Sequence, residues 1–216
     1  MDRRSRCMIV GVAGASASGK TSACRVIQKM LANLGVESFI ISQDWFYHEL
    51  SAGTDGDTYN WDAPEAFDNR LLVTLLIALK DPLSQNQLWA PDHDYSAYKV
   101  IPKAHPIPKV PVYLVEGIMV LQSSIIRPLL DLKLYIECDR ETAFARRVIR
   151  DINERHYALP LIIERYKKYV APAFLTHIEP SRSYADLIIV NNGDKGLADH
   201  RGLRAVVNGI LVDIQS

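Results

Sequence analysis

A short segment near the start of the chain has the residue types and the spacing that suit the binding of phosphate groups. Residues 14–21 read GASASGKT and match the pattern G-x-x-x-x-G-K-[ST] without a gap. The two glycines allow backbone N–H groups to surround a phosphate, and Lys20 can reach the phosphate oxygens. The Thr21 hydroxyl is the type of ligand that holds Mg²⁺ in such loops. The segment therefore predicts a site for the phosphates of a nucleotide.

The flanking sequence supplies the context that this phosphate loop needs. An apolar run at residues 8–13 predicts a strand directly before it, and an amphipathic pattern predicts a helix over residues 20–34, which Gly35 ends. The positive end of this helix dipole would face the same phosphates. The alternative, a chance match in a turn of small residues, does not explain the strand and the helix. The residues predicted to bind the donor are Gly14, Ala15, Ser16, Ala17, Ser18, Gly19, Lys20, Thr21 and Ser22.

Two acidic residues stand where predicted strands end. Asp44 follows a strand at residues 36–42, and Glu116 ends a strand at residues 112–116. In open parallel sheets, ligands bind at the carboxyl ends of the strands. One acid can act as base for an attacking hydroxyl, and either can hold Mg²⁺ directly or through water. A single acid of this kind often only caps a turn, but two beside a phosphate loop predict a phosphoryl-transfer site, with metal ligands Thr21, Asp44 and Glu116.

The predicted helix at residues 141–154 carries several arginines. In the simplest interpretation it is a solvated face on which Arg147 and Asp151 pair at i,i+4, an interaction of only ~0.2–0.5 kcal/mol. Phosphoryl transfer, however, requires cations that neutralise the transferring group, and guanidinium groups do this with two parallel hydrogen bonds. Together with a second predicted helix at residues 161–169, these arginines predict a closing lid at about residues 146–170.

Strand-like and helix-like segments alternate along the chain, which predicts an α/β fold with a mostly parallel sheet. The 216 residues, 48% of them hydrophobic, suffice for one domain with a sizeable core. Further strands are predicted at residues 132–137 and 187–190. Further helices are predicted at residues 124–130, at residues 203–214 and after Asp62, which is placed to cap the helix start.

Residues 81–111 contain six prolines between polar and aromatic residues. The aromatic residues of this segment, Trp89, Tyr95 and Tyr98, would be poorly retained in an open linker. The segment therefore predicts a proline-interrupted hairpin at about residues 84–108.

The composition narrows the possible classes of protein. The 25 Lys and Arg balance the 25 Asp and Glu to a formal net charge of +0, so no nucleic acid and no membrane surface is expected as a partner held by charge. Cys7, Cys24 and Cys138 have no C-x-x-C spacing, which argues against a disulfide framework or a zinc site and suits a reducing compartment. No apolar segment reaches the ~20 residues of a membrane span. We therefore expect a cytoplasmic protein.

Several motifs follow one another in the order found in the uridine-cytidine kinase family, and the chain resembles this family of P-loop nucleoside kinases, related to phosphoribulokinase. The matching segments are the phosphate loop, SQDWFY at 42–47, NWDAPEAFD at 60–68, EGI at 116–118, RRVIRD at 146–151 and YADLII at 184–189. The match covers most of the chain, from about residue 10 to about residue 190. It implies a single P-loop kinase domain over residues 1–216, with a central parallel sheet, a β-hairpin over the acceptor and an arginine-bearing lid.

The resemblance also implies the substrates and the acceptor-side roles. The implied donor is ATP with Mg²⁺, the acceptor is a small nucleoside, and the protein forms a homo-oligomer. Asp44 matches the base for the nucleoside 5′-hydroxyl, while Asp62 and Arg147 match the pair that holds the ribose hydroxyls. Tyr47 and Trp61 match aromatic positions that line the nucleoside pocket.

On the donor side, the resemblance implies that lid arginines meet the phosphates. Arg150 and Arg155 match these arginines, and Glu116 matches the acid near the metal. The residues implied to be catalytic are Asp44, Lys20 and Arg150.

Departures from the family pattern fall together on the base pocket. The family hairpin reads Tyr-Asp-Phe-x-x-His, whereas residues 93–98 read HDYSAY here. The lid usually has Arg-Gly-Arg and later Gln-Tyr, whereas this chain has RHY at residues 155–157 and RY at residues 165–166. Ribose and phosphate contacts are thus kept, while base contacts change. The predicted base-side residues are His93, Tyr95, Tyr98, Tyr157 and Arg165.

The expected function is ATP-dependent 5′-phosphorylation of uridine, cytidine or both, as in pyrimidine salvage. The Tyr98 phenol would favour cytidine, because it can accept a hydrogen bond from the 4-amino group. Alternatively, the acceptor is another riboside or a phosphorylated or carboxylated metabolite whose anionic group Arg165 reaches, or Tyr157 and Arg165 simply point to solvent. A further alternative is a nucleotide-binding regulator without turnover, which the retained acceptor-side Asp44 and Asp62 argue against.

Overall fold

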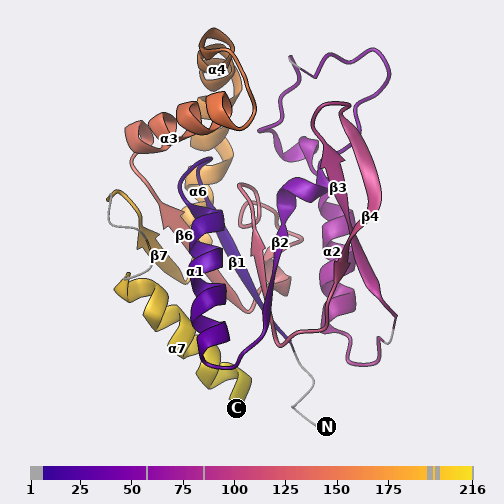
Figure 1. Ribbon diagram of the computed structural model, residues 1–216, viewed down its shortest axis with the longest axis vertical. Coiled ribbons are helices and arrows are strands. Elements are labelled where there is room, and N and C mark those ends of the chain that lie inside the picture. Colours follow the sequence, from indigo (N-terminus) through magenta and orange to yellow (C-terminus); the bar gives the residue numbers. More distant parts are fainter. Residues whose placement is uncertain (1–6, 57, 85, 194–196, 198–199, 216) are drawn as a thin grey trace.

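The computed structural model describes residues 7–56, 58–84, 86–193, 197 and 200–215. Its centre is a five-stranded parallel sheet with the strand order β2-β5-β1-β6-β7 (Figure 1). The strands are β1 Met8–Gly14, β2 Ser38–Ser42, β5 Val112–Glu116, β6 Leu132–Glu137 and β7 Leu187–Val190. Helices flank the sheet, so the predicted α/β fold with a parallel sheet is confirmed.

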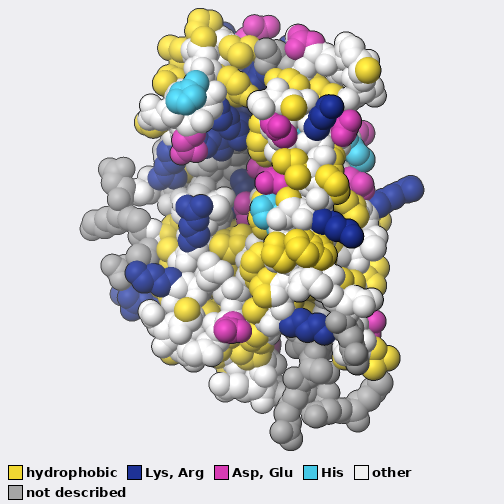
Figure 2. All heavy atoms as spheres, turned by 45° about the vertical axis from the view of Figure 1, so that its right-hand side comes forward, with side chains coloured by type: hydrophobic (Ala, Val, Ile, Leu, Met, Phe, Trp, Pro, Cys, Tyr) yellow, Lys and Arg dark blue, Asp and Glu magenta, His cyan; other side chains and the backbone are white. Residues whose placement is uncertain are grey.

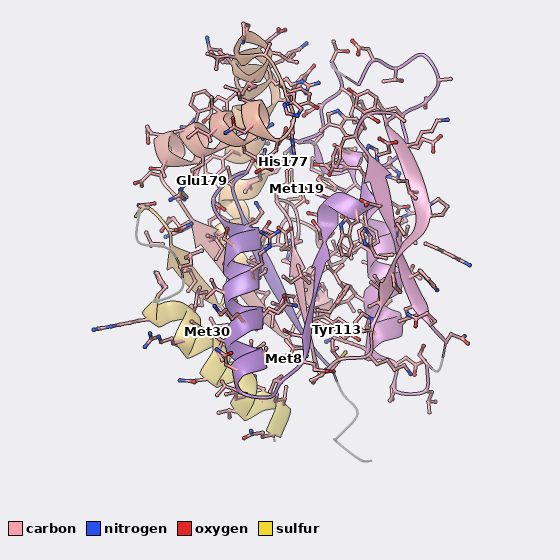
Figure 3. All side chains as sticks on the ribbon, viewed as in Figure 1. Met8, Met30, Tyr113, Met119, His177 and Glu179 are labelled. Atoms are coloured by element: carbon pink, nitrogen blue, oxygen red, sulfur yellow. The ribbon has the colours of Figure 1, made fainter. Side chains whose placement is uncertain are left out.

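Alternate residues of the central strands face two separate hydrophobic cores. Ile9 and Tyr113 belong to one core, whereas Val10 and Leu114 belong to the other. Strands covered on both faces read as continuous apolar runs, which is why β1 and β5 were recognisable from sequence. In Figure 3, the labelled Met119 and Tyr113 mark the first core, and the labelled Met8 and Met30 mark the second.

The helices α1 (Lys20–Asn33) and α7 (Arg201–Gln215) cover one face of the sheet, and α2 (Asn69–Lys80) covers the other (Figure 1). The predicted start of α2 was wrong. The cap is Asp68, whose carboxylate accepts a hydrogen bond from the Leu71 N–H at 2.9 Å. The segment after Asp62 forms only a short 3₁₀ turn, Pro64–Ala66, and the Asp62 side chain does not cap it.

The hairpin predicted at about residues 84–108 is present as β3 (Leu88–Asp94) and β4 (Lys99–Ile107). It forms a separate two-stranded antiparallel sheet beside α2 (Figure 1). In its turn, the Asp94 carboxylate accepts hydrogen bonds from the backbone N–H groups of Ser96 and Ala97, at 2.8 and 3.1 Å. These contacts hold the turn that carries Tyr95 and Tyr98.

The segment predicted to be a lid, for which the name lid is kept here, contains α3 (Arg140–Asn153) and a second, longer helical segment. This segment begins with α4 (Leu159–Arg165) and continues through the helical turns η5 Tyr166–Val170, α5 Ala171–Ala173, η6 Phe174–Ile178, α6 Glu179–Ser181 and η7 Arg182–Tyr184. The predicted end at residue 169 was therefore wrong. Pro172 and Pro180 lie inside the segment and have no N–H group to donate to the carbonyl one turn earlier. A π-helical turn precedes each proline and accommodates the missing hydrogen bond. The helix predicted at residues 124–130 is only one 3₁₀ turn, η4 Arg127–Leu129.

The remaining fold expectations concern cysteines and membrane spans. Cys7, Cys24 and Cys138 are buried, and within the described residues none of the three is part of a disulfide. Within the part of the chain that the structure describes, no helix has the length and the apolar character needed to cross a membrane.

Candidate active site

A cavity of about 660 Å³ opens at the carboxyl edge of the sheet, between the phosphate loop, the hairpin turn and the lid. Figure 2 shows basic side chains gathered in the groove between the lid and the hairpin side of the molecule. The predicted site residues that line the cavity are Ser16, Ala17, Gly19, Lys20, Thr21, Ser22, Asp44, Tyr47, Trp61, Asp62, Tyr95, Tyr98, Glu116, Arg147, Arg150, Arg155, Tyr157 and Arg165. Four predicted residues do not line it: Gly14, Ala15, Ser18 and His93.

The phosphate loop joins the end of β1 to the start of α1 in a conformation that requires glycine. Gly14 and Gly19 have φ values of 147° and 99°. A Cβ atom at Gly14 would lie 2.3 Å from the Ile136 carbonyl oxygen, so no larger residue fits there. The Lys20 ammonium group donates to the Ala15 carbonyl at 2.8 Å and therefore lies folded over the loop.

Asn191, which directly follows the edge strand β7, supports the phosphate loop. It was not predicted from the sequence. Its amide Nδ2 donates to the Ser18 carbonyl at 2.7 Å. The only sequence signal was its place directly after β7, at the same carboxyl edge. Arg146 lies nearby, because its guanidinium donates to the Asn191 carbonyl at 3.1 Å and to the Gly193 carbonyl at 3.4 Å. Further cavity residues that the sequence analysis missed at this end are Arg25, Gly193 and Leu197.

Glu116 lies among side-chain oxygen atoms that could serve as metal ligands. Its Oε1 atom accepts hydrogen bonds from the Ser42 hydroxyl at 3.0 Å and from the Thr21 hydroxyl at 3.3 Å. Burial raises the pKa of Glu116, and the nearby Lys20 ammonium partly opposes this rise. Burial likewise lowers the pKa of Lys20, while Glu116 and Asp44 act in the opposite direction. Hard oxygen donors of this kind fit Mg²⁺, which keeps several water ligands of its own.

Asp44 is held by the 3₁₀ turn that follows β2. This turn, Gln43–Phe46, is capped by the Ser42 hydroxyl, which accepts from the Asp44 N–H at 3.3 Å. Gln43 is fully buried and anchors the turn, since its Oε1 accepts from the Met119 N–H at 2.9 Å and its Nε2 donates to Asn69 at 3.0 Å. The sequence analysis missed both Ser42 and Gln43, although both stand directly before the acid.

Asp62 and Arg147 lie together on the acceptor side of the cavity. The Arg147 Nη1 atom is 3.8 Å from the Asp62 carboxylate, and their side chains are 11% and 12% exposed. Burial raises the pKa of Asp62, and the positive charge of Arg147 partly opposes this rise. The nearby cation thus offsets part of the cost of burying the ionised carboxylate.

Asp151 binds three lid arginines and is itself buried. The Nε and Nη2 atoms of Arg150 donate to the same Asp151 oxygen at 2.9 and 2.8 Å. Arg147 lies 3.3 Å and Arg155 lies 3.7 Å from the Asp151 carboxylate. The simple interpretation of a solvated Arg147–Asp151 pair was therefore wrong, because the Asp151 side chain is only 3% exposed.

Aromatic rings form the wall of the cavity beyond Asp62. Tyr47 stacks on Phe67 at 4.3 Å and meets the edge of Trp61 at 5.3 Å, between ring centroids. Trp61 in turn stacks with Tyr98 at 5.5 Å. His93 packs behind these rings, buried against Tyr47 and Trp61, and burial lowers its pKa.

The segment around Gly56 joins the acceptor wall to the second lid helix. The Gly56 carbonyl accepts hydrogen bonds from Trp61 Nε1 at 2.9 Å and from Arg165 Nη2 at 3.4 Å. The Arg165 guanidinium also lies over the Tyr157 ring, 4.8 Å from its centroid. Both Arg165 and Tyr157 line the cavity, and their contact with the acceptor stays a prediction.

The parallel sheet, the phosphate loop at the end of β1 and the lid above it define a P-loop kinase, a phosphotransferase that acts on an alcohol group. A family model described as the phosphoribulokinase / uridine kinase family matches residues 9–198. The chain belongs to this family.

Similar proteins include several named as uridine kinases. "Uridine kinase" of Macrococcus caseolyticus is 37% identical over 197 residues, which cover 90% of this chain and 93% of that protein. "Uridine kinase-like protein 5" of Arabidopsis thaliana is 34% identical over 192 residues, but these cover 88% of this chain and only 40% of that longer protein. The phosphoribulokinase structure from Rhodobacter spheroides has a TM-score of 0.62 at 16% identity, covering 86% of this chain and 70% of that one. That likeness shows the shared fold.

Proposed function

We propose that the protein phosphorylates the 5′-hydroxyl of a pyrimidine ribonucleoside, uridine, cytidine or both, with ATP as donor, as a step of pyrimidine salvage. One observation carries the proposal: the buried Asp62–Arg147 pair lies in the same cavity as the phosphate loop and Asp44. A carboxylate and a guanidinium side by side suit a vicinal diol, because one accepts and the other donates hydrogen bonds. The relatives named uridine kinase give further support.

The reaction requires an in-line attack on the terminal phosphate. Asp44 accepts the proton of the ribose 5′-hydroxyl while the new O–P bond forms and the bond to the departing ADP breaks. Thr21, Glu116 and Asp44 would hold Mg²⁺, directly or through water, and the metal would neutralise charge on the phosphate oxygens. Positioning both reactants in one cavity provides much of the acceleration.

Cations of the loop and of the lid neutralise the transferring group. Lys20 reaches the phosphates from the loop, and Arg150 and Arg155 reach them from the lid after they leave Asp151. The aromatic wall of Tyr47, Trp61 and Tyr98 offers stacking surfaces to a planar base.

A second candidate acceptor is another riboside, or a small hydroxyl-bearing metabolite with an anionic group. The cavity position of Arg165 and Tyr157, where the family pattern has other side chains, favours this alternative. A nucleotide-binding regulator without turnover is the remaining alternative. In that case Asp44 and Asp62 would have no substrate to contact.

The decisive experiment couples ADP formation to a spectroscopic readout with Mg²⁺, on uridine and cytidine side by side. Turnover on either riboside that collapses in Asp44→Asn is the expected result. Nicotinamide riboside, pantothenate and ribulose 5-phosphate extend the panel of acceptors. Binding of ATP without phosphorylation of either pyrimidine riboside would overturn the proposal and direct the search to the other acceptors or to a regulator.

A further inference from the structure

Arg147 is fixed by side chains from three separate parts of the chain. Its Nη1 atom donates to the Ser16 hydroxyl at 2.8 Å and lies 3.8 Å from the Asp62 carboxylate. Its Nε atom lies 3.3 Å from the Asp151 carboxylate on the same helix. Because only 11% of the Arg147 side chain is exposed, water competes little for these contacts.

One of the groups that fix Arg147, the Ser16 hydroxyl, belongs to the phosphate loop. Backbone N–H groups and the Lys20 side chain serve the phosphates in such loops, so the side chain of Ser16 is available for another contact. Here the Ser16 oxygen receives the hydrogen bond of a lid arginine. A single serine thus connects the loop of the donor to the arginine beside the acceptor-side carboxylate.

The Asp151 contact alone would leave Arg147 less constrained. Arg147 and Asp151 lie on the same helix, and Arg150 and Arg155 share the Asp151 carboxylate, so this pair does not place Arg147 relative to the sheet. The hydrogen bond from Ser16 ties the guanidinium to a different element, the loop between β1 and α1. This contact determines how the lid arginine is placed relative to the sheet.

We propose that Ser16 is a positioning residue that acts through Arg147 and couples occupancy of the phosphate loop to binding of the acceptor. An ordered loop holds the Ser16 hydroxyl in place, the hydroxyl holds Arg147, and Arg147 with Asp62 holds the hydroxyl groups of the acceptor. Coupling between two ligands is reciprocal, so the acceptor strengthens donor binding by the same factor. The inference rests on the proposed function for the identity of the acceptor.

The first test measures this coupling by titration calorimetry on the full chain. Uridine and cytidine are titrated with and without a non-hydrolysable ATP analogue and Mg²⁺, in the wild type, Ser16→Ala and Ser16→Thr. We expect the analogue to tighten riboside binding roughly tenfold in the wild type, as one charge-assisted hydrogen bond allows. Ser16→Thr keeps the hydroxyl and the coupling, whereas Ser16→Ala reduces the factor towards one; the affinity for the analogue alone is measured in each variant as the reference.

Two results of the calorimetry would overturn the inference. One is a coupling factor in Ser16→Ala equal to that of the wild type. The other is an equal loss of analogue binding and riboside binding in Ser16→Ala, which would indicate general damage to the loop.

A second measurement needs no acceptor and separates this inference from the proposed function. Carbon-13 NMR follows the titration of the Asp62 carboxyl. Besides burial, the charges of Arg147, Asp44, Arg155 and Arg150 influence its pKa. If Ser16 holds Arg147, its loss in Ser16→Ala raises the pKa of Asp62, while Ser16→Thr leaves it unchanged. An unchanged pKa in Ser16→Ala contradicts the inference. Absence of riboside binding in the wild type, with the expected pKa change, contradicts only the proposed acceptor.

Discussion

At the scale of single residues, Asp151 is the counter-charge that several lid arginines share. One buried carboxylate faces Arg147, Arg150 and Arg155. Replacing it by Asn keeps the shape but leaves the guanidinium groups without their counter-charge. Breaking a fully buried pair costs about 3–5 kcal/mol, and the partial exposure of Arg150 and Arg155 reduces the expected loss to about 2 kcal/mol. Urea unfolding of Asp151→Asn measures it.

A matched control for Asp151 is available directly before the same helix. Asp139 precedes α3, and its side chain makes no capping hydrogen bond. Asp139→Asn should therefore change the unfolding free energy by less than about 0.5 kcal/mol. Equal losses in both variants would refute the special role of Asp151.

Asp62 links function to the pH dependence of stability. Burial raises its folded-state pKa above the ordinary value of 3.8, even with Arg147 nearby. Protonation of this group therefore favours the folded state: its stabilising effect is full below pH 3.8 and is lost as the pH rises through the raised pKa. Relative to the wild type, Asp62→Asn should gain unfolding free energy as the pH rises through this window, while losing riboside binding.

The measurement is a series of urea unfolding curves for both proteins between acidic and neutral pH. A difference in unfolding free energy that stays constant across the series would contradict a raised pKa for Asp62. Arg147→Lys separates the charge of Arg147 from its shape, because lysine keeps the positive charge and loses the planar guanidinium.

Tyr98 tests whether the changed base pocket selects the base. Its ring stacks with Trp61. In the proposed reaction its phenol would offer a hydroxyl to the base edge. Tyr98→Phe keeps the ring and removes the hydroxyl. We expect the ratio of kcat/KM for cytidine over uridine to fall about three- to tenfold, the range of one neutral hydrogen bond. An unchanged ratio would show that Tyr98 acts only as a stacking surface.

At the scale of elements, the start of α2 has a clear energetic test. The Asp68 carboxylate caps this helix through the Leu71 N–H. Asp68→Ala should lower the unfolding free energy by about 1 kcal/mol, whereas Asp68→Asn retains most of the cap. Thermal unfolding of the two variants decides whether the cap acts as expected, and equal stability of both would argue against it.

The sequence predicted the elements whose signals are local. The strands β1, β5 and β6 are buried on both faces and read as apolar runs, and α1 follows the phosphate loop. The second lid helix was predicted too short, because proline normally ends a helix. In the structure, Val170, Ala173 and Ile178 of this segment are buried, and their packing sustains a helix that π-helical turns adapt to Pro172 and Pro180.

The site residues, too, could be predicted only where the sequence signal is local. Residues inside motifs, such as Asp44 and Arg147, could be placed on the cavity from sequence. Gln43 and Asn191 could not be recognised, because their partners are 76 and 173 residues away in sequence. His93 was placed in the pocket by its position in the hairpin, but the rings of Tyr47 and Trp61 cover it.

At the scale of the whole molecule, charge is distributed unevenly. The chain has a formal net charge of +0, yet seven Lys or Arg and only four Asp or Glu line the cavity. The surplus of cations suits an anionic donor, and salt screens such an attraction. Raising the salt concentration from about 50 to about 500 mM should raise the KM for ATP about three- to tenfold, and the KM for a neutral riboside much less.

Steady-state kinetics at both salt concentrations, with Mg²⁺ in excess, provide the measurement. A neutral riboside is the internal control, since it shares the cavity without sharing the charge. Equal salt dependence of the two KM values would contradict the prediction, because a neutral riboside has no charge for the salt to screen.

The position of β1 between β5 and β6 has a consequence for how the protein unfolds. It is the central strand, and both of its neighbours are themselves paired on their outer sides, with β2 and β7 at the edges of the sheet. Amide hydrogen exchange should therefore be slowest in β1, because both ladders must break to expose it. The phosphate loop is attached to this last strand to open. The base of the donor site would then persist through local openings that disrupt the lid, and a nucleotide could still find the loop while the acceptor side is open.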